Sequence, residues 1–215
     1  MHYGFHYRHR ADTVLLRRMI DARELGDIYA ATAFSLRRRG IPGWGVFTNK
    51  ELQGGGALLD IGVHMLDLAL HLMGYPKPRE VVGHVGQYLG NRPGVGLLGE
   101  WDASSLTVED TARAMVTFEN GASLLLDVSY MANIEEKDTM RVKCRGTNAG
   151  ASLFPLMLHT EKYGALFDEQ PAYLTQSDPY ERKIQLFLEA CREEPSYRQA
   201  EEAVILHRII DHIYA

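Results

Sequence analysis

The sequence predicts an α+β fold. Two observations support it: helical periodicity marks both ends of the chain, and a block of alternating, β-branched segments lies between them. Helices that are kept apart from a run of strands are typical of α+β domains rather than of doubly wound sheets. The 215 residues, 46% of them hydrophobic, suffice for one good-sized core, so we expect a single domain over residues 1–215.

The N-terminal part begins with a strand-like stretch, Tyr3–Arg8, and continues into a helix from Asp12, its cap, to about Leu25. Gly26 provides the stop. Ile28–Leu36 then alternates as a strand. An irregular loop follows and leads into a long apolar helix that ends at Gly74 and Pro76.

Beyond that helix the hydrophobic period changes from 3.6 to 2. Asn120-Gly121 suits the positive φ angles of a tight hairpin turn and makes the strands on either side antiparallel neighbours. Apolar residues at helical spacing then predict two C-terminal helices, around 180–191 and 203–214, with a break at Pro195. The predicted strands of the central block are Val81–Tyr88, Thr111–Phe118, Ala122–Tyr130 and Met140–Arg145.

Composition narrows the class of partner. The net charge is −5, and the short basic clusters are interleaved with acidic residues, so no nucleic-acid footprint is evident. Cys144 and Cys191 lie far apart and in no CxxC pattern, which indicates reduced thiols and a cytoplasmic location. We expect no membrane partner, because the first residues lack an apolar leader and the long apolar helix is interrupted by charged residues.

Four ionisable residues on the long apolar helix form the most informative feature. At about 100° per residue, Asp60, His64, Asp67 and His71 fall within an arc of about 60°. The other positions are apolar nearly all round, which is the pattern of a buried helix. Its polar stripe must therefore be paired internally or line a cleft.

Three interpretations of the stripe are open. The residues can be paired structurally, since each Asp and His are one turn apart. They can share a metal ion. They can also perform acid/base chemistry, with His64 as proton acceptor and Asp60 orienting it or binding a substrate hydroxyl. Three glycines, Gly54, Gly55 and Gly56, bare the backbone at the start of the helix and favour a functional interpretation.

Residues 94–99 satisfy the letters of the dinucleotide fingerprint G-x-G-x-x-G. That motif works only where a strand turns directly into a helix. Here it precedes a stretch without helical spacing, so we interpret it as a glycine-rich connection.

The segment from Gly54 to Asp67 resembles the signature helix of the C-terminal domain in the glucose-fructose oxidoreductase, inositol dehydrogenase and rhizopine-catabolism family (Gfo/Idh/MocA). Further segments of the chain resemble the same family in the same order: Glu24–Ile28 its first turn, Val108–Ala112 and Phe118–Ala122 its central hairpin, and Arg145–Gly150 its G-T-x-G segment.

This resemblance implies an open, predominantly antiparallel sheet with helices on one face, as in dihydrodipicolinate-reductase-like C-terminal domains. It implies part of an NAD- or NADP-dependent oxidoreductase acting on a sugar, cyclitol or related polyol, and a homo-oligomer formed through the open sheet face. It makes Asp60 and His64 the catalytic pair, with His64 removing a hydroxyl proton as hydride leaves the same carbon. Gly54, Gly55, Gly56, Asp67 and His71 then support the pair.

The family's N-terminal dinucleotide-binding domain has no counterpart in these 215 residues. We therefore expect this chain alone to bind neither NAD nor NADP tightly and to be inactive. Two rival hypotheses are a non-catalytic sugar-binding or assembly module and a metal-dependent hydrolase or isomerase, although we assign no metal ligand. Side chains that suit polyol binding are Arg8, Trp44, Tyr130, His159 and Tyr163.

Overall fold

A computed structural model describes residues 3–176, 178–192 and 198–215 and arranges them around one eight-stranded sheet. The strand order is β2-β3-β4-β1-β5-β6-β7-β8, and all neighbouring pairs are antiparallel except β1 with β4. The predicted α+β class with a predominantly antiparallel sheet is confirmed. The strands are β1 Ile28–Arg37, β2 Pro78–Gly86, β3 Thr111–Phe118, β4 Ser123–Ser129, β5 Asp138–Gly146, β6 Gly150–Leu153, β7 Met157–Lys162 and β8 Ala165–Glu169.

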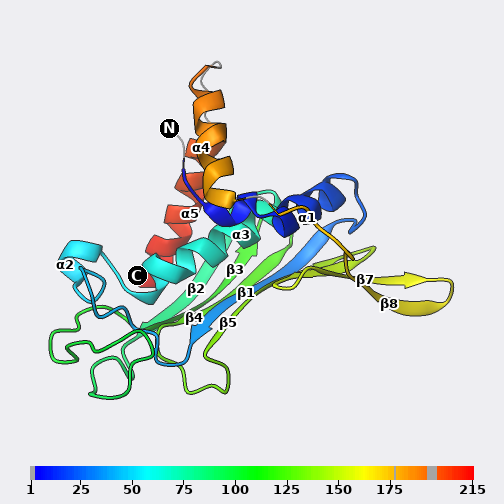
Figure 1. Cartoon of the computed structure of the whole chain (residues 1–215). Coiled ribbons are helices and arrows are strands. Elements are labelled where there is room, and N and C mark those ends of the chain that lie inside the picture. The colour runs from blue at the N-terminus through cyan, green and yellow to red at the C-terminus, as the bar shows by residue number, and fades with distance from the viewer. Residues whose placement is uncertain (1–2, 177, 193–197) are drawn as a thin grey trace.

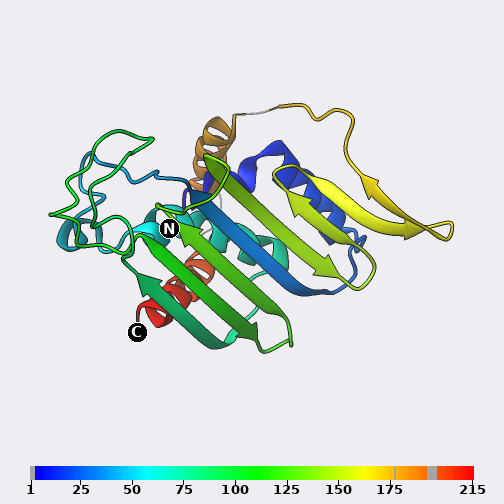
Figure 2. The same cartoon turned by 90° about the horizontal axis from the view of Figure 1, so that it is seen from below.

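The helices gather on one face of the sheet (Figure 1), and a view from below shows the other face uncovered (Figure 2). Helix α3 lies over β1 and β5, and α5 lies over β2. The sequence of the central helix is apolar nearly all round because the sheet, α1 and α5 enclose it. The helices are α1 Ala11–Asp21, α2 Lys50–Gln53, α3 Val63–Met73, α4 Pro179–Ala190 and α5 Arg198–Tyr214, with a short 3-10 helix η1 at His6–His9 and a π-helix η2 at Leu58–Gly62.

The helical run Lys50–Met73 is long and apolar enough, by length and composition, to cross a membrane. In this structure two thirds of its most apolar window is buried inside the protein. It is therefore the core helix of the domain.

The Asn-Gly hairpin is confirmed. Gly121 has a φ of 85°, and the turn joins β3 and β4 in antiparallel register, with Thr117 opposite Ser123. Both C-terminal helices are also present, whereas Pro195, which was expected to separate them, lies outside the described residues.

Three predictions of local structure are wrong. Tyr3–Arg8 forms no strand, because its aromatic side chains pack against His64 and α4 and the chain coils into η1. Helix α1 begins at Ala11 after the N-cap residue Arg10, so Asp12 lies in the first turn and is not the cap as predicted. The helix ends at Asp21, earlier than Leu25, since Arg23 and Gly26 take positive φ angles. Strands β6, β7 and β8 were not predicted, because they have only four to six residues each and β7 ends in the polar run His159–Lys162.

The uncovered sheet face carries both apolar and charged side chains. Val82, Met115 and Leu125, from three adjacent strands, are each about half exposed or more. Arg113 of β3 and Asp127 of β4 form an ion pair, with 3.1 Å between Nε and Oδ1. This uncovered face, with its mixed apolar and charged side chains, is the one through which we predicted that the protein forms oligomers.

Candidate functional site

The predicted catalytic pair lies where the central helix changes its winding. Asp60 belongs to the π-helix η2, and His64 lies in the first turn of α3 that follows it. A π-turn closes with i→i+5 hydrogen bonds and is frequently found at functional sites. The residues of the predicted stripe have different partners: Asp60 lies beside Arg37, His64 among aromatic rings and Asp67 against Arg8.

The start of this helix is fixed by Glu109, which sequence reasoning did not place in the site. Its carboxylate accepts hydrogen bonds from the backbone N–H of Gly56 at 2.9 Å and of Leu58 at 3.0 Å, and from the hydroxyl of Tyr214 at 2.8 Å. A carboxylate at a helix N-terminus satisfies orphan N–H donors and interacts favourably with the helix dipole. The acidic residue lies on the loop before β3, and no local spacing indicates it.

The three glycines allow this close approach. A Cβ atom on Gly55 would lie 2.1 Å from the Tyr214 hydroxyl, and one on Gly56 would lie 2.0 Å from the carbonyl oxygen of Glu109. Gly54 has a φ of 90°, which favours glycine. The backbone N–H groups at this glycine-rich start thus donate hydrogen bonds to Glu109. Gly55 itself packs against Tyr214 of α5.

Asp60 faces the ends of two strands. Its Oδ2 lies 3.7 Å from Nη1 of Arg37, the last residue of β1, and both side chains are about a quarter exposed. The Arg37 guanidinium lies 5.8 Å from the ring centroid of Tyr130, which follows β4. The Tyr130 hydroxyl lies near Asp60 without reaching hydrogen-bond geometry; burial raises the pKa of Tyr130, and the charge of Asp60 raises it further. Tyr130 is completely buried.

His64 lies among aromatic side chains of the N-terminal segment. Its ring meets Phe5, His6 and Tyr7 nearly edge-on, at centroid distances of 5.9, 5.4 and 5.7 Å. The Nδ1 atom is buried and has no hydrogen-bond partner among the described residues. Burial lowers the pKa of His64, and the negative charge of Asp60 opposes this shift. Because the pKa of His64 is lowered, its imidazole is neutral at neutral pH and able to accept a proton.

Asp67 belongs to a separate buried group. It is fully buried and accepts hydrogen bonds from Arg8 Nε at 2.8 Å and Nη2 at 2.5 Å, and from the Tyr75 hydroxyl. Arg8 Nη1 also bonds Glu202 of α5 at 2.6 Å. This network ties η1, α3 and α5 together, so Asp67 supports the site by fixing its framework. The Arg8 guanidinium donates hydrogen bonds to Asp67, Glu202 and Tyr75.

The remaining candidates lie elsewhere. His71 is at the far end of α3, where its carbonyl oxygen accepts a hydrogen bond from Arg17 at 3.0 Å. Trp44 is half exposed in the loop before α2, against Phe47. His159 lies on β7, three strands from β1, and bonds Asp168 at 2.6 Å. Tyr163 is 99% exposed at the β7–β8 turn. Of the polyol-binding candidates, Tyr130 is the one brought close to Asp60.

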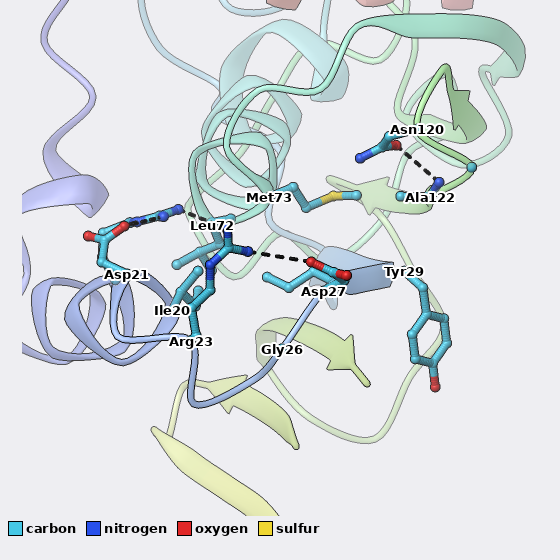
Figure 3. A pocket seen from close by; sticks show the side chains of 13 residues that line it. Ile20, Asp21, Arg23, Gly26, Asp27, Tyr29, Leu72, Met73, Asn120 and Ala122 are labelled. Carbon is cyan, nitrogen blue, oxygen red and sulfur yellow. Dashed lines mark hydrogen bonds and ion pairs between the residues drawn. The ribbon is translucent and has the colours of Figure 1, made fainter. Parts of the chain in front are cut away.

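A cavity of about 660 Å³ lies at the opposite end of α3 from Asp60 (Figure 3). Its charged side chains form two ion pairs, Arg17 with Asp21 at 2.5 Å and Arg23 with Asp27 at 3.4 Å. It contains neither Asp60 nor His64. The predicted catalytic pair therefore does not share a cavity with these ion pairs.

The structure bears on two possible ligands of this chain, a metal ion and a dinucleotide. Among the residues that the structure describes, no three His, Cys, Asp or Glu side chains converge as a metal site would require, so the geometry does not support the metal interpretation of the stripe. Residues 94–99 lie in a loop followed by neither strand nor helix until β3, and the glycine-rich start of the central helix is occupied by Glu109. Neither place offers a pyrophosphate cradle.

Comparison with known proteins settles the family. Residues 13–151 match the model of the GFO/IDH/MocA C-terminal domain. The chain belongs to the Gfo/Idh/MocA family. It is 39% identical over 213 residues to the D-glucoside 3-dehydrogenase of Escherichia coli K12, a match that covers 99% of this chain and 61% of that protein.

Solved structures agree with the Gfo/Idh/MocA fold. The aldose-aldose oxidoreductase of Caulobacter crescentus, complexed with glycerol, superposes with a TM-score of 0.73 at 19% identity, covering 98% of this chain and 59% of that one. A levoglucosan dehydrogenase in complex with NADH and levoglucosan gives a TM-score of 0.73 at 19% identity, covering 98% and 63%. The chain thus spans about three fifths of the length of these relatives.

Proposed function

We propose that this chain is the substrate-binding domain of an NAD- or NADP-dependent dehydrogenase that oxidises a sugar, cyclitol or related polyol. The observation that carries the proposal is the position of Asp60 one turn before a half-buried His64 of lowered pKa, in the signature helix of a Gfo/Idh/MocA domain. Similar proteins support the substrate class, since one is a D-glucoside 3-dehydrogenase and another is a levoglucosan dehydrogenase in complex with levoglucosan.

The chemistry assigned to this chain is proton transfer and substrate orientation. Neutral His64 accepts the proton of the hydroxyl that is oxidised, and a carbonyl forms at that carbon. Asp60 accepts a hydrogen bond from a neighbouring hydroxyl, while Arg37 holds its carboxylate in place. The buried ring of Tyr130 packs against the Arg37 guanidinium.

NAD or NADP supplies the hydride acceptor in such an enzyme. Neither glycine-rich segment of the described chain offers a pyrophosphate cradle, and we propose that another domain holds the cofactor and that this chain alone binds it weakly. Calorimetry of the isolated chain with NAD tests this; micromolar affinity would overturn it.

The proposal also covers the state of the chain in the cell. We propose that residues 1–215 act as one substrate-binding and oligomerisation domain in the cytoplasm, without nucleic-acid or membrane partners. Half-exposed apolar side chains on the uncovered sheet face, Val82, Met115 and Leu125, support a dimer or tetramer formed through that face. Sedimentation equilibrium of the chain and of a Leu125→Arg variant tests this assembly.

A fusion protein tests the function. In it, the part of the E. coli relative that precedes the matched region is joined to Tyr3 of this chain. We expect NAD-dependent oxidation of methyl glucosides or levoglucosan, followed as NADH absorbance. If the fusion binds NADH and a sugar but transfers no hydride, the chain is instead a non-catalytic sugar-binding module.

A further inference from the structure

Tyr214, the last residue of α5, is joined to the start of the central helix through Glu109. Its hydroxyl donates a hydrogen bond to Glu109 Oε1 at 2.8 Å, and a Cβ atom on Gly55 would lie 2.1 Å from the same hydroxyl oxygen. Burial raises the pKa of Tyr214, and the charge of Glu109 raises it further, so the hydroxyl stays protonated and remains a donor. The C-terminal end of α5 is therefore bonded to the acceptor that holds the helix start.

Glu109 binds the backbone of three successive residues there. Its carboxylate oxygens accept hydrogen bonds from the N–H groups of Gly56 and Leu58, and its carbonyl oxygen accepts one from the N–H of Ala57 at 3.2 Å. The Glu109 residue is buried, so water does not readily replace these bonds. Loss of this acceptor would leave buried N–H donors unpaired, which costs free energy.

The two residues bound by the carboxylate also hold the π-turn. The carbonyl oxygen of Gly56 accepts a hydrogen bond from the N–H of Asp60 at 2.9 Å. The carbonyl oxygen of Leu58 accepts the bond from the N–H of Val63 that closes the π-turn. His64 follows Val63 directly. The positions of Gly56 and Leu58 therefore determine where the helix presents both predicted catalytic side chains.

We propose that Tyr214 and Glu109 are positioning residues for the hydroxyl oxidation: Tyr214 fixes the Glu109 carboxylate, and Glu109 sets the helix winding that places Asp60 and His64. This assignment rests on the proposed function, which gives Asp60 and His64 their roles. Neither positioning residue contacts the substrate. Their effect is on rate, because a misplacement of reacting groups by about 1 Å can cost about 10²-fold.

Amide hydrogen exchange of this chain tests the positioning without sugar or NAD. We expect Tyr214→Phe to make peptides from residues 56–64 exchange about fivefold faster, because one hydrogen bond no longer opposes local opening. Peptides of β5 should exchange at the parent rate. The matched control is Tyr88→Phe, which removes an exposed hydroxyl 2.7 Å from His84 Nε2 and should leave residues 56–64 unchanged. Unchanged exchange in Tyr214→Phe, or equal acceleration in every peptide, overturns the proposal.

Kinetics of the fusion protein test the consequence for catalysis. We expect kcat to fall about tenfold in Tyr214→Phe and about 10²-fold in Glu109→Gln, with NADH affinity within about twofold of the parent. The larger loss is expected because a glutamine amide has one acceptor oxygen and would meet the other backbone donor with its own N–H₂ group.

A Tyr214→Phe fusion protein with the parent's kcat overturns the proposal. A loss of NADH affinity as large as the loss of kcat also overturns it, since the substitution would then disturb the whole fold. If the parent fusion protein itself oxidises no sugar, the proposed function fails, whereas the exchange comparison still decides whether Tyr214 fixes the start of the helix.

Discussion

Arg37 lies 3.7 Å from Asp60 and at the same time above the ring of Tyr130. Three residues from β1, η2 and the end of β4 thus meet at one point, although they are far apart in the sequence. The arrangement holds the Asp60 carboxylate toward the side of the helix on which His64 follows one turn later. The Arg37 guanidinium is the charged partner of this carboxylate, which we propose accepts a hydrogen bond from a substrate hydroxyl.

Replacing Arg37 should therefore affect catalysis more than folding. In the fusion protein, Arg37→Gln should lower kcat/KM by about tenfold, because misplacing a group that orients the substrate is costly. The partly exposed ion pair contributes only about 1 kcal/mol or less to stability. Steady-state kinetics and thermal melting measure the two effects. Arg37→Lys, which keeps the charge, should retain more activity; equal loss in both variants would point to a packing role.

The Arg8–Asp67 pair should matter mainly for stability. Removing one partner of a buried ion pair costs about 3–5 kcal/mol, because the other charge stays buried without compensation. Arg8→Gln in this chain should lower the Tm by about 10 °C. The double variant Arg8→Gln/Asp67→Asn should recover part of this loss, since the orphaned carboxylate is removed. An unchanged Tm in the single variant would contradict the structural role given to Arg8, because Asp67, Glu202 and Tyr75 all contact η1 through its guanidinium.

Close approach at Gly56 gives a third prediction. Gly56→Ala places a methyl group 2.0 Å from the carbonyl oxygen of Glu109. Because this is too close, we expect the free energy of unfolding to fall by about 1–3 kcal/mol. The matched control is Gly94→Ala, whose Cβ would lie 3.8 Å from Trp101 in ordinary contact. Urea unfolding of both variants measures the difference. Comparable stability of the two would contradict the packing role given to Gly56.

Stability should depend on pH through the histidines near the site. Burial lowers the pKa of both His64 and His6 from the usual 6.5. The unfolded chain then binds more protons than the folded chain below pH 6.5, so stability is complete above that pH and is lost as the pH falls toward the folded pKa values. The Tm should drop between pH 7.5 and 5.5, and His64→Gln should reduce the drop. A pH dependence that the substitution leaves unchanged argues against a buried neutral His64.

The contrast between predicted and unpredicted features follows the range of the interactions. Asp60 and His64 are one turn apart, so periodicity alone places them together, and the Asn-Gly turn predicts its own hairpin. Glu109 and Arg37 reach the same site from other elements, and no local pattern connects them with Asp60. The π-turn is invisible to a regular helical projection. Asp67 and His64 both follow it, and their different partners, Arg8 and the aromatic rings, belong to the N-terminal segment, which no spacing within the helix indicates. Strands β6–β8 are too short and polar to show alternation.

The central claim is that His64 removes the hydroxyl proton while Asp60 holds the substrate. Its most direct measurement is kcat of the His64→Gln variant of the fusion protein, with NADH and sugar binding measured alongside. We expect kcat to fall by about 10²–10⁴-fold, the usual contribution of a general base, with binding of both ligands retained. A variant that keeps most of the parent's kcat would contradict the assignment.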